Sequence, residues 1–212
     1  MKTLLLRLAA PLQSWGADSK FERRTTMREP TKSGVIGMIA AAMGRGRDEN
    51  IEDLAELGFG VRIDQPGQML RDFHTAQVLK EKHPRITDRF YLSDAIFLVA
   101  LEGNEDLLHE IEQALLNPVF PLYLGRRSCP PSGRLVLGLR DKSLKDALLE
   151  EAWQAASFYQ KRFKTADLTI VIDAKQPGAL RRPDLPISFS QTHKKYAYRY
   201  IEDIPAAVRM GD

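Results

Sequence analysis

The first hydrophobic segment of the chain, Thr3 to Leu8, has the length of a β-strand and is followed by the turn-like sequence PLQSWG. From Val35 to Met43 every residue is apolar or, at Gly37, has no side chain. A helix that is apolar on all sides is a buried helix, and Gly44 can end it in a left-handed conformation. The pattern therefore predicts a first strand followed by a helix inside the core.

Shorter apolar and alternating patterns follow this helix. Residues 51–57 predict a short second helix, and residues 58–63 alternate as a strand before a turn at Gln65-Pro66-Gly67. Residues 69–78 can return as the hairpin partner of that strand. The segment from Lys80 to Phe90, KEKHPRITDRF, is polar, basic and too long for a tight turn. We expect it to be a protruding loop, either a solvated connection or a site of interaction.

A second strand and helix complete the expected core. Residues 95–101 form an apolar strand pattern, and Asn104 is placed to cap an amphipathic helix that runs through Leu116. Residues 122–125 or 134–139 can supply the next strand. The succession βαββαβ over residues 1–140 is the ferredoxin-like (RRM-like) arrangement, which many RNA-binding folds share. The expected fold class is α+β.

The remaining residues, 141–212, are expected to form a smaller C-terminal unit. It contains a helical pattern over residues 143–158, a strong strand over residues 168–172, and a final pair of strands rich in aromatic and β-branched residues. We interpret this unit as an appended β-rich domain or as an extension of the sheet.

A basic segment leads into the buried helix and suggests an anion site. Its charged residues are Arg23, Arg24, Arg28 and Lys32, with Arg45 after the helix. The first N–H groups of a helix are unpaired and carry partial positive charge, so phosphate is stabilised there. Lys32, Ser33 and Gly34 lie in the first turn, where Thr31 or Ser33 can cap the helix. The alternative is an ordinary helix start with solvated charges.

A Walker-type nucleotide site is excluded at this position. Such a site requires the pattern G-x-x-x-x-G-K-[ST], and no glycine lies between Ala17 and Ser33. The 212-residue chain is long enough for one large domain or two small ones. Its single cysteine, Cys129, excludes an internal disulfide framework and a Cys-rich zinc site. The apolar N-terminal stretch, interrupted by Arg7, is too short for a secretory signal.

Charge is distributed unevenly along the chain. Residues 1–47 hold nine Lys and Arg against three Asp and Glu, residues 48–120 hold six against fifteen, and residues 121–212 hold sixteen against ten. The segments therefore carry +6, −9 and +6, which give the formal net charge of +3. Two basic segments around an acidic one suggest one side that faces a polyanion. No apolar run reaches membrane-spanning length, so we expect a soluble, cytoplasmic protein without a membrane partner.

Two further clusters could bind anions or RNA. The sequence YLGRRSCPP, from Tyr123 to Pro131, places adjacent arginines after a glycine, and a guanidinium can bind phosphate through two hydrogen bonds. Near the C-terminus, Tyr196, Tyr198 and Tyr200 alternate with basic residues. These tyrosines either pack against the protein or stack on bases.

The histidines show no metal-binding pattern. None of His74, His83, His109 and His193 has metal-ligand spacing to another histidine. His74 shares a strand face with Asp72, so it is a candidate general base, an RNA donor or a structural histidine. No acid/base site is visible in the sequence.

Five segments, in order and at compatible spacing, resemble the Cas-five family of the CRISPR-associated RAMP superfamily, in its type I-E Cascade branch. They are LLLRLAAPLQSWG, PTKSGVIGMIAAAMG, LRDFHT, YLSDAIFLVAL and YLGRRSCP. The resemblance implies a modified ferredoxin-like fold that caps one end of the CRISPR surveillance complex and holds the 5′ handle of the CRISPR RNA. It implies as partners the backbone, large and processing subunits, and target DNA through the complex.

The resemblance also implies the positions of the binding residues. Those for RNA are Gln13, Ser14, Trp15, Arg24, Arg28, Lys32, Ser33, Gly34, Arg71, His74, Arg126 and Arg127. A thumb at about residues 78–90 is expected to pack on the backbone subunit through Val78, Lys80, Lys82, His83, Arg85 and Arg89. Single-stranded RNA would then be held through phosphate contacts and stacking.

Two functions are compatible with this resemblance. The favoured one is a non-catalytic RNA-binding subunit, with no metal and no cofactor, because type I-E systems use a separate processing subunit. The alternative is a metal-independent endoribonuclease that processes CRISPR repeat RNA, as type I-C relatives do. Such cleavage needs a base and an acid, and His74, Tyr123 and Lys32 are the candidates.

Overall fold

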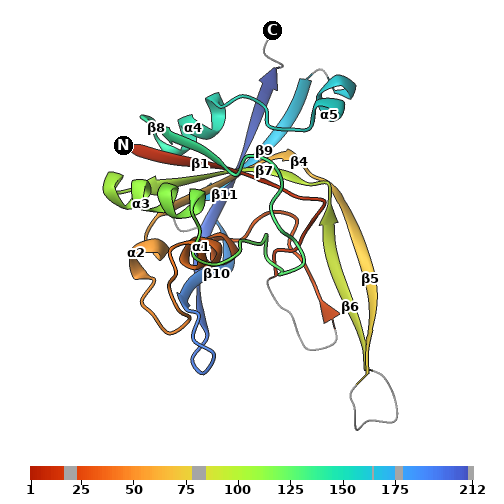
Figure 1. Cartoon of the computed structure of the whole chain (residues 1–212). Helices are drawn as coiled ribbons and strands as arrows, with labels where there is room; N and C mark the ends of the chain where they lie inside the picture. Colours follow the sequence, from red (N-terminus) through yellow and green to blue (C-terminus); the bar gives the residue numbers. More distant parts are fainter. Residues whose placement is uncertain (17–22, 78–84, 164, 175–178, 210–212) are drawn as a thin grey trace.

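The structure is a computed structural model and describes residues 1–16, 23–77, 85–163, 165–174 and 179–209 (Figure 1). Its main element is a seven-stranded sheet in the order β10-β11-β9-β4-β7-β1-β8, in which all neighbouring strands are antiparallel. The strands are β1 (Lys2–Ala9), β4 (Gly58–Gln65), β7 (Ile96–Gly103), β8 (Val136–Arg140), β9 (Thr165–Asp173), β10 (Leu180–Ser188) and β11 (Lys195–Arg209).

Helices cover both faces of this sheet. They are α1 (Lys32–Ala42), α2 (Glu52–Ala55), α3 (Glu105–Leu116), α4 (Leu144–Glu150) and α5 (Ser157–Arg162). Leu4, Leu6 and Leu8 of β1 pack with α1 and α3, whereas Leu5 packs with α4 on the opposite face. A strand buried on both faces does not need to alternate polar and apolar positions, which explains the apolar residues of β1 on either side of the half-buried Arg7.

The predicted core elements are present. The buried first helix is confirmed as α1, whose residues Val35, Ile36 and Ile39 are fully buried. Asn104 caps α3 as expected, because its side-chain oxygen accepts hydrogen bonds from the backbone N–H groups of Asp106 and Leu107. The central strands lie in the order β4-β7-β1-β8, with α1 in the connection from β1 to β4 and α3 in the connection from β7 to β8.

The predicted hairpin between residues 58–63 and 69–78 is wrong. Strand β4 already pairs with β7 on one side and β9 on the other, so no edge is free for β5 (Gln68–Ala76). At Gly67 the chain takes a positive φ of 68° and leaves the main sheet. Strand β5 pairs instead with β6 (Arg85–Ser93), in a second sheet that also contains the short strands β2 (Leu12–Gln13) and β3 (Arg23–Arg24).

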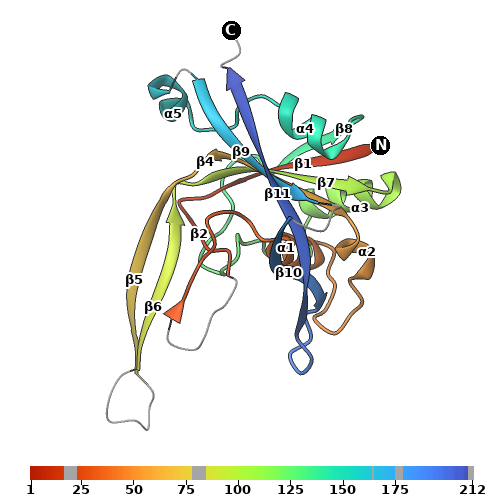
Figure 2. The ribbon, with the colours of Figure 1, turned by 180° about the vertical axis from the view of Figure 1, so that it is seen from behind.

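Strands β5 and β6 form a two-stranded arm that extends away from the main sheet (Figures 1 and 2). The expected protruding loop over residues 80–90 is therefore corrected in part, since residues 85–90 belong to β6. Residues 80–84 lie outside the described residues.

The C-terminal third also differs from its prediction. The single helix expected over residues 143–158 is two helices, because the buried Arg62 donates hydrogen bonds to the carbonyl oxygens of Leu148, Glu151 and Ala152. These contacts satisfy carbonyl groups where α4 ends. The strand expected at 168–172 is confirmed as β9, and its pairing with β4 joins the C-terminal strands to the main sheet. No helix among the described residues is long and apolar enough to cross a membrane.

Candidate nucleic-acid interface

A groove with a volume of about 1280 Å³ runs along one side of α1. The small residues Ser33, Gly34, Gly37, Ala40 and Ala41 lie at helical spacing and form its floor. One wall is the segment 120–130, and the other is the tip of the β10–β11 hairpin. These walls contribute Phe120, Tyr123, Arg127, Phe189, Lys194 and Tyr196. The groove therefore combines aromatic rings with basic side chains, the combination that holds single-stranded nucleic acids.

The wall that contains Arg127 is held tightly against the residue that follows β2. The backbone N–H of Ser14 donates to the carbonyl oxygen of Leu124 at 3.1 Å. Gly125 has a φ of 85°, and a Cβ atom there would lie 1.7 Å from the carbonyl oxygen of Ser14. Only glycine fits this approach. The two sequence motifs PLQSWG and YLGRRSC, which are distant in the chain, thus form one structural unit.

Gln13, Ser14 and Trp15 support this unit from below. They are 0%, 2% and 0% exposed. The Gln13 side-chain amide donates to the carbonyl oxygen of Ala95 at 2.7 Å, and the Trp15 indole N–H donates to Gln13 Oε1 at 3.1 Å. The Trp15 ring lies against Gly34, where a Cβ atom would be 2.9 Å from it. These three side chains, expected at the RNA site, are buried under the groove, and their contact with RNA stays a prediction.

Lys32 is also buried, at 4% exposed. Its Nζ lies 3.3 Å from Asp173 Oδ2, and its backbone N–H donates to Asp184 Oδ2 at 2.9 Å. Arg199 bridges the same two carboxylates. The anion at the N-terminus of α1 is therefore Asp184, a residue of the chain itself. The phosphate contact expected for Lys32 stays a prediction, although this side chain already has an anionic partner in Asp173.

Burial lowers the pKa of Lys32 below its ordinary value, although Asp173 partly opposes this effect.

Thr31 caps α1 as predicted, since its Oγ1 accepts a hydrogen bond from the backbone N–H of Gly34 at 3.2 Å. Ser33 is half-buried and lines the groove.

The adjacent arginines of YLGRRSC have different environments. Arg126 Nη2 donates to the carbonyl oxygen of Arg24 at 2.8 Å, and its guanidinium lies 4.6 Å from the ring centroid of Tyr91. Arg127 is exposed and lines the groove. The neighbouring Cys129 is 1% exposed, and burial raises the pKa of its thiol. Of the two arginines, Arg127 is the one directed to the groove.

Arg71 and His74 lie on the arm and not in the groove. Arg71 is exposed and forms two hydrogen bonds with Asp88, at 2.9 and 3.0 Å. His74 is exposed in β5. The structure therefore does not bring together the three residues considered for catalysis, since Tyr123 lines the groove and Lys32 is buried.

Two of the six expected thumb residues lie in the described part of the arm. Val78, Lys80, Lys82 and His83 lie outside the described residues. Arg85 and Arg89 belong to β6, where they are opposite Ala76 and Asp72 of β5. Three apolar side chains of the arm are exposed, with Met69 at 49%, Phe73 at 60% and Ile86 at 51%. The register of β5 and β6 places these three on one face of the arm.

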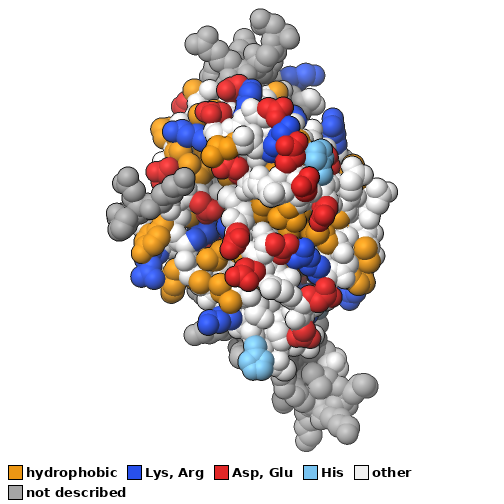
Figure 3. Space-filling model, turned by 90° about the vertical axis from the view of Figure 1, so that its left-hand side faces the viewer, with side chains coloured by type: hydrophobic (Ala, Val, Ile, Leu, Met, Phe, Trp, Pro, Cys, Tyr) orange, Lys and Arg blue, Asp and Glu red, His pale blue; other side chains and the backbone are white. Residues whose placement is uncertain are grey.

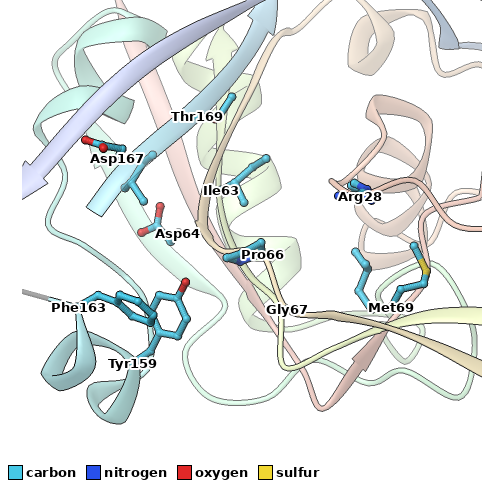
Figure 4. Close-up of a pocket in the computed structure, with 12 residues that line it drawn as sticks. Arg28, Ile63, Asp64, Pro66, Gly67, Met69, Tyr159, Phe163, Asp167 and Thr169 are labelled. Atoms are coloured by element: carbon cyan, nitrogen blue, oxygen red, sulfur yellow. The ribbon is translucent and has the colours of Figure 1, made fainter. Parts of the chain in front are cut away.

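A second pocket lies between α5 and the bend from β4 to β5 (Figure 4). Tyr159 and Phe163 form one wall, with ring centroids 4.7 Å apart, and Arg28 lies across the pocket from them. Asp64 and Asp167 also line it. Asp64 is paired with the buried Arg62, but the exposed Asp167 faces a single basic lining residue, Arg28, so this pocket is a poorer RNA site than the groove. The position of Arg28 places that residue outside the α1 groove.

The distribution of charge on the folded molecule also favours the α1 groove over the second pocket as the RNA site. The side of the molecule that carries α2 and α3 shows many carboxylates (Figure 3), and exposed examples are Glu52, Asp53, Glu105, Asp106 and Glu110. The groove contains Arg47, Arg127 and Lys194, and none of these three forms an ion pair with a described carboxylate. No cluster of three or more potential metal-ligating side chains occurs within the described part of the chain.

The sequence did not indicate Arg47, Phe120 or Phe189 as groove residues. They come from three separate segments, and only the packing of the hairpin and the 120–130 segment against α1 brings them together. The available signal was the spacing of small residues in α1, which leaves Met38 as the large side chain of this helix that lines the groove.

The family model for CRISPR-associated proteins of the Cas5 type matches residues 3–202. The chain belongs to the Cas5 family. It is 39% identical over 156 residues to the CRISPR system Cascade subunit CasD of Escherichia coli (strain K12), covering 64% of this chain and 70% of the relative. The predicted resemblance is thereby confirmed.

Solved structures agree with the membership in the Cas5 family. A crystal structure of a Cas protein superposes with a TM-score of 0.80 and 38% identity, covering 99% of this chain and 98% of the other. A chain from a CRISPR RNA-guided surveillance complex gives a TM-score of 0.82 at 34% identity, covering 98% and 91%.

Proposed function

We propose that this Cas5 protein is a Cascade subunit of a CRISPR surveillance complex and that it holds the 5′ handle of the CRISPR RNA in the α1 groove. The observation that carries the proposal is the groove itself. It presents three basic side chains that have no carboxylate partner among the described residues, beside aromatic rings and over a helix floor of mostly small residues. Phosphates would contact Arg47, Arg127 and Lys194, and bases would stack on the aromatic rings.

The fold supports this role. The strand order β4-β7-β1-β8, with α1 and α3 on one face, is the order expected for a ferredoxin-like core, and we include that core in the proposal. Gln13, Trp15 and Gly125 support the groove from below. These residues of the motifs PLQSWG and YLGRRSC would therefore have a structural role that needs no contact with RNA.

The arm is proposed as the thumb that packs on the backbone subunit. Met69, Phe73 and Ile86 present a largely exposed apolar face, and such faces are typical of protein interaction sites. A non-catalytic role is also part of the proposal, because His74, Tyr123 and Lys32 lie in three different environments. A cytoplasmic location, with CRISPR RNA and other Cascade subunits as partners, completes it.

The proposal is tested by binding of a 5′-handle RNA to the assembled complex. Arg127→Ala and Arg47→Ala are expected to weaken handle retention, whereas Lys145→Ala, on the exposed side of α4, serves as the matched control. Equal retention of the 5′-handle RNA in all three variants would exclude the α1 groove as its binding site. Incubation of repeat RNA with the protein in chelator tests the alternative, since specific cleavage lost in His74→Ala would establish the endoribonuclease.

A further inference from the structure

A row of exposed tyrosines lies on one face of β11. Tyr196, Tyr198 and Tyr200 are 39%, 58% and 40% exposed, and their alternate positions place them on the same face. The residues between them point to the other side, where Arg199 is buried next to α1. The tyrosines are therefore on the face of β11 opposite Arg199, and Tyr196, next to the hairpin tip, also lines the α1 groove. We call these three residues the tyrosine row.

Basic side chains lie directly over these rings. The Arg181 guanidinium is 4.5 Å from the ring centroid of Tyr198 and 5.9 Å from that of Tyr200. Lys194 Nζ is 5.3 Å from the centroid of Tyr196. Neither Arg181 nor Lys194 forms an ion pair with a carboxylate among the described residues. Their charges therefore remain available to phosphate, while the cation–π contacts hold rings and cations in place.

The row is continuous with the groove. Tyr196 and Lys194 line the groove and also begin the tyrosine row. Successive tyrosines are about 6.8 Å apart along the strand, which is twice the 3.4 Å rise of stacked bases in a duplex. Only an extended, unstacked strand can place successive bases on successive rings.

We propose that the tyrosine row is a second contact surface for single-stranded RNA and binds the part of the CRISPR RNA that continues from the α1 groove. The inference rests on the proposed function, because it takes the strand in the groove as its starting point. Charge complementarity and continuity with the groove identify this occupant. A bound DNA strand or a protein subunit would give different outcomes in the test below.

The test uses the assembled complex with CRISPR RNA that carries 5-iodouridine at successive positions. After irradiation, we expect crosslinks to Tyr198 and Tyr200 from nucleotides adjacent in sequence to those that crosslink to Tyr123 or Tyr196. Crosslinks confined to the groove would overturn the inference and leave the proposed function intact. Crosslinks to the row without any to the groove would contradict the groove assignment. Crosslinks to the row from labelled target DNA alone, or protection of the row by a protein subunit in RNA-free complex, would also overturn it.

Variants provide a second measurement. Tyr198→Ala is expected to lower the affinity for single-stranded RNA by about fivefold or more, and Tyr198→Phe is expected to retain it, because stacking requires the ring and not the hydroxyl. Phe158→Ala removes an equally exposed ring on α5, at 65% exposed, and is the matched control. Equal affinities of the Tyr198→Ala and Phe158→Ala variants would contradict the inference.

Discussion

The carboxylate of Asp184 in β10 occupies the N-terminus of α1, where its Oδ2 accepts a hydrogen bond from the backbone N–H of Lys32 at 2.9 Å. A carboxylate at this position satisfies an unpaired N–H group and interacts favourably with the helix dipole. Arg199 binds the same carboxylate through two hydrogen bonds, at 2.6 and 3.0 Å. The contact thus links the helix under the groove to the hairpin that forms one groove wall.

Loss of the Asp184 charge should destabilise the protein. Among the described residues, Asp184→Asn leaves the buried Arg199 with Asp173 as its one anionic partner, so we expect the free energy of unfolding to fall by about 3 kcal/mol. Urea denaturation measures this change. Asp167→Asn, which alters an exposed carboxylate on β9, is expected to change stability by less than about 0.5 kcal/mol. Similar effects of both substitutions would refute the structural role of Asp184.

Because of the close approach at Gly125, we expect Gly125→Ala to lower the stability of the protein more than a glycine-to-alanine substitution that adds backbone strain alone. Gly133→Ala introduces a Cβ at a φ of 72° with its nearest neighbour 3.6 Å away, so it should cost about 1 to 2 kcal/mol. Gly125→Ala adds a collision with the Ser14 carbonyl oxygen and should cost more. Thermal unfolding of the two variants compares these losses of stability. Equal melting temperatures would show that the 120–130 segment moves to accommodate the added Cβ atom at little cost.

Salt dependence distinguishes Arg127 from Lys32. If Arg127 neutralises one phosphate, Arg127→Ala should reduce the slope of log affinity against log salt by about one, in magnitude. Lys32→Ala should leave that slope unchanged, because its ammonium is buried beside Asp173. Titrations of a 5′-handle RNA with the assembled complex at several salt concentrations measure both slopes. A flatter slope for Lys32→Ala would restore that residue to the RNA site.

The buried thiol of Cys129 predicts a pH effect on stability. Burial raises its pKa in the folded state above the ordinary value of 9.0, so the thiol form is favoured by folding. This contribution is fully present below pH 9.0 and is lost as pH rises through the folded-state pKa. The stability difference between the unmodified protein and Cys129→Ala should therefore decrease above pH 9.0. Denaturation at several pH values tests this, and a constant difference would speak against a buried thiol.

The exposed face of the arm should matter for assembly and not for folding. Phe73→Ser and Ile86→Ser replace exposed apolar side chains, so each should leave the free energy of unfolding within about 0.5 kcal/mol of its original value. We expect the double variant to retain less backbone subunit on co-purification. Val119→Ser, an exposed apolar position beside Gly44 in the body, is the control for a general loss of apolar surface. Normal retention by the arm variant would argue against the proposed thumb.

The amino-acid pattern alone determined most of the local structure. The all-apolar segment after Val35 predicted a buried helix, and Asn104 predicted the start of α3. Both signals depend only on residues that are close in the sequence. The ordered motifs also identified the Cas5 family. These signals lie within short segments, where side-chain chemistry and backbone geometry are directly coupled.

Long-range pairing and burial were decided only by the tertiary structure. The pattern could not reveal that β9 occupies the free edge of β4 and directs β5 into the arm, because an apolar alternation does not specify its partner strand. Nor could it show that Lys32 faces Asp173 and Asp184, which are 141 and 152 residues away. A basic side chain at a helix start looks the same in sequence whether it binds RNA or a carboxylate of its own chain. Its environment depends on which distant strands pack against it.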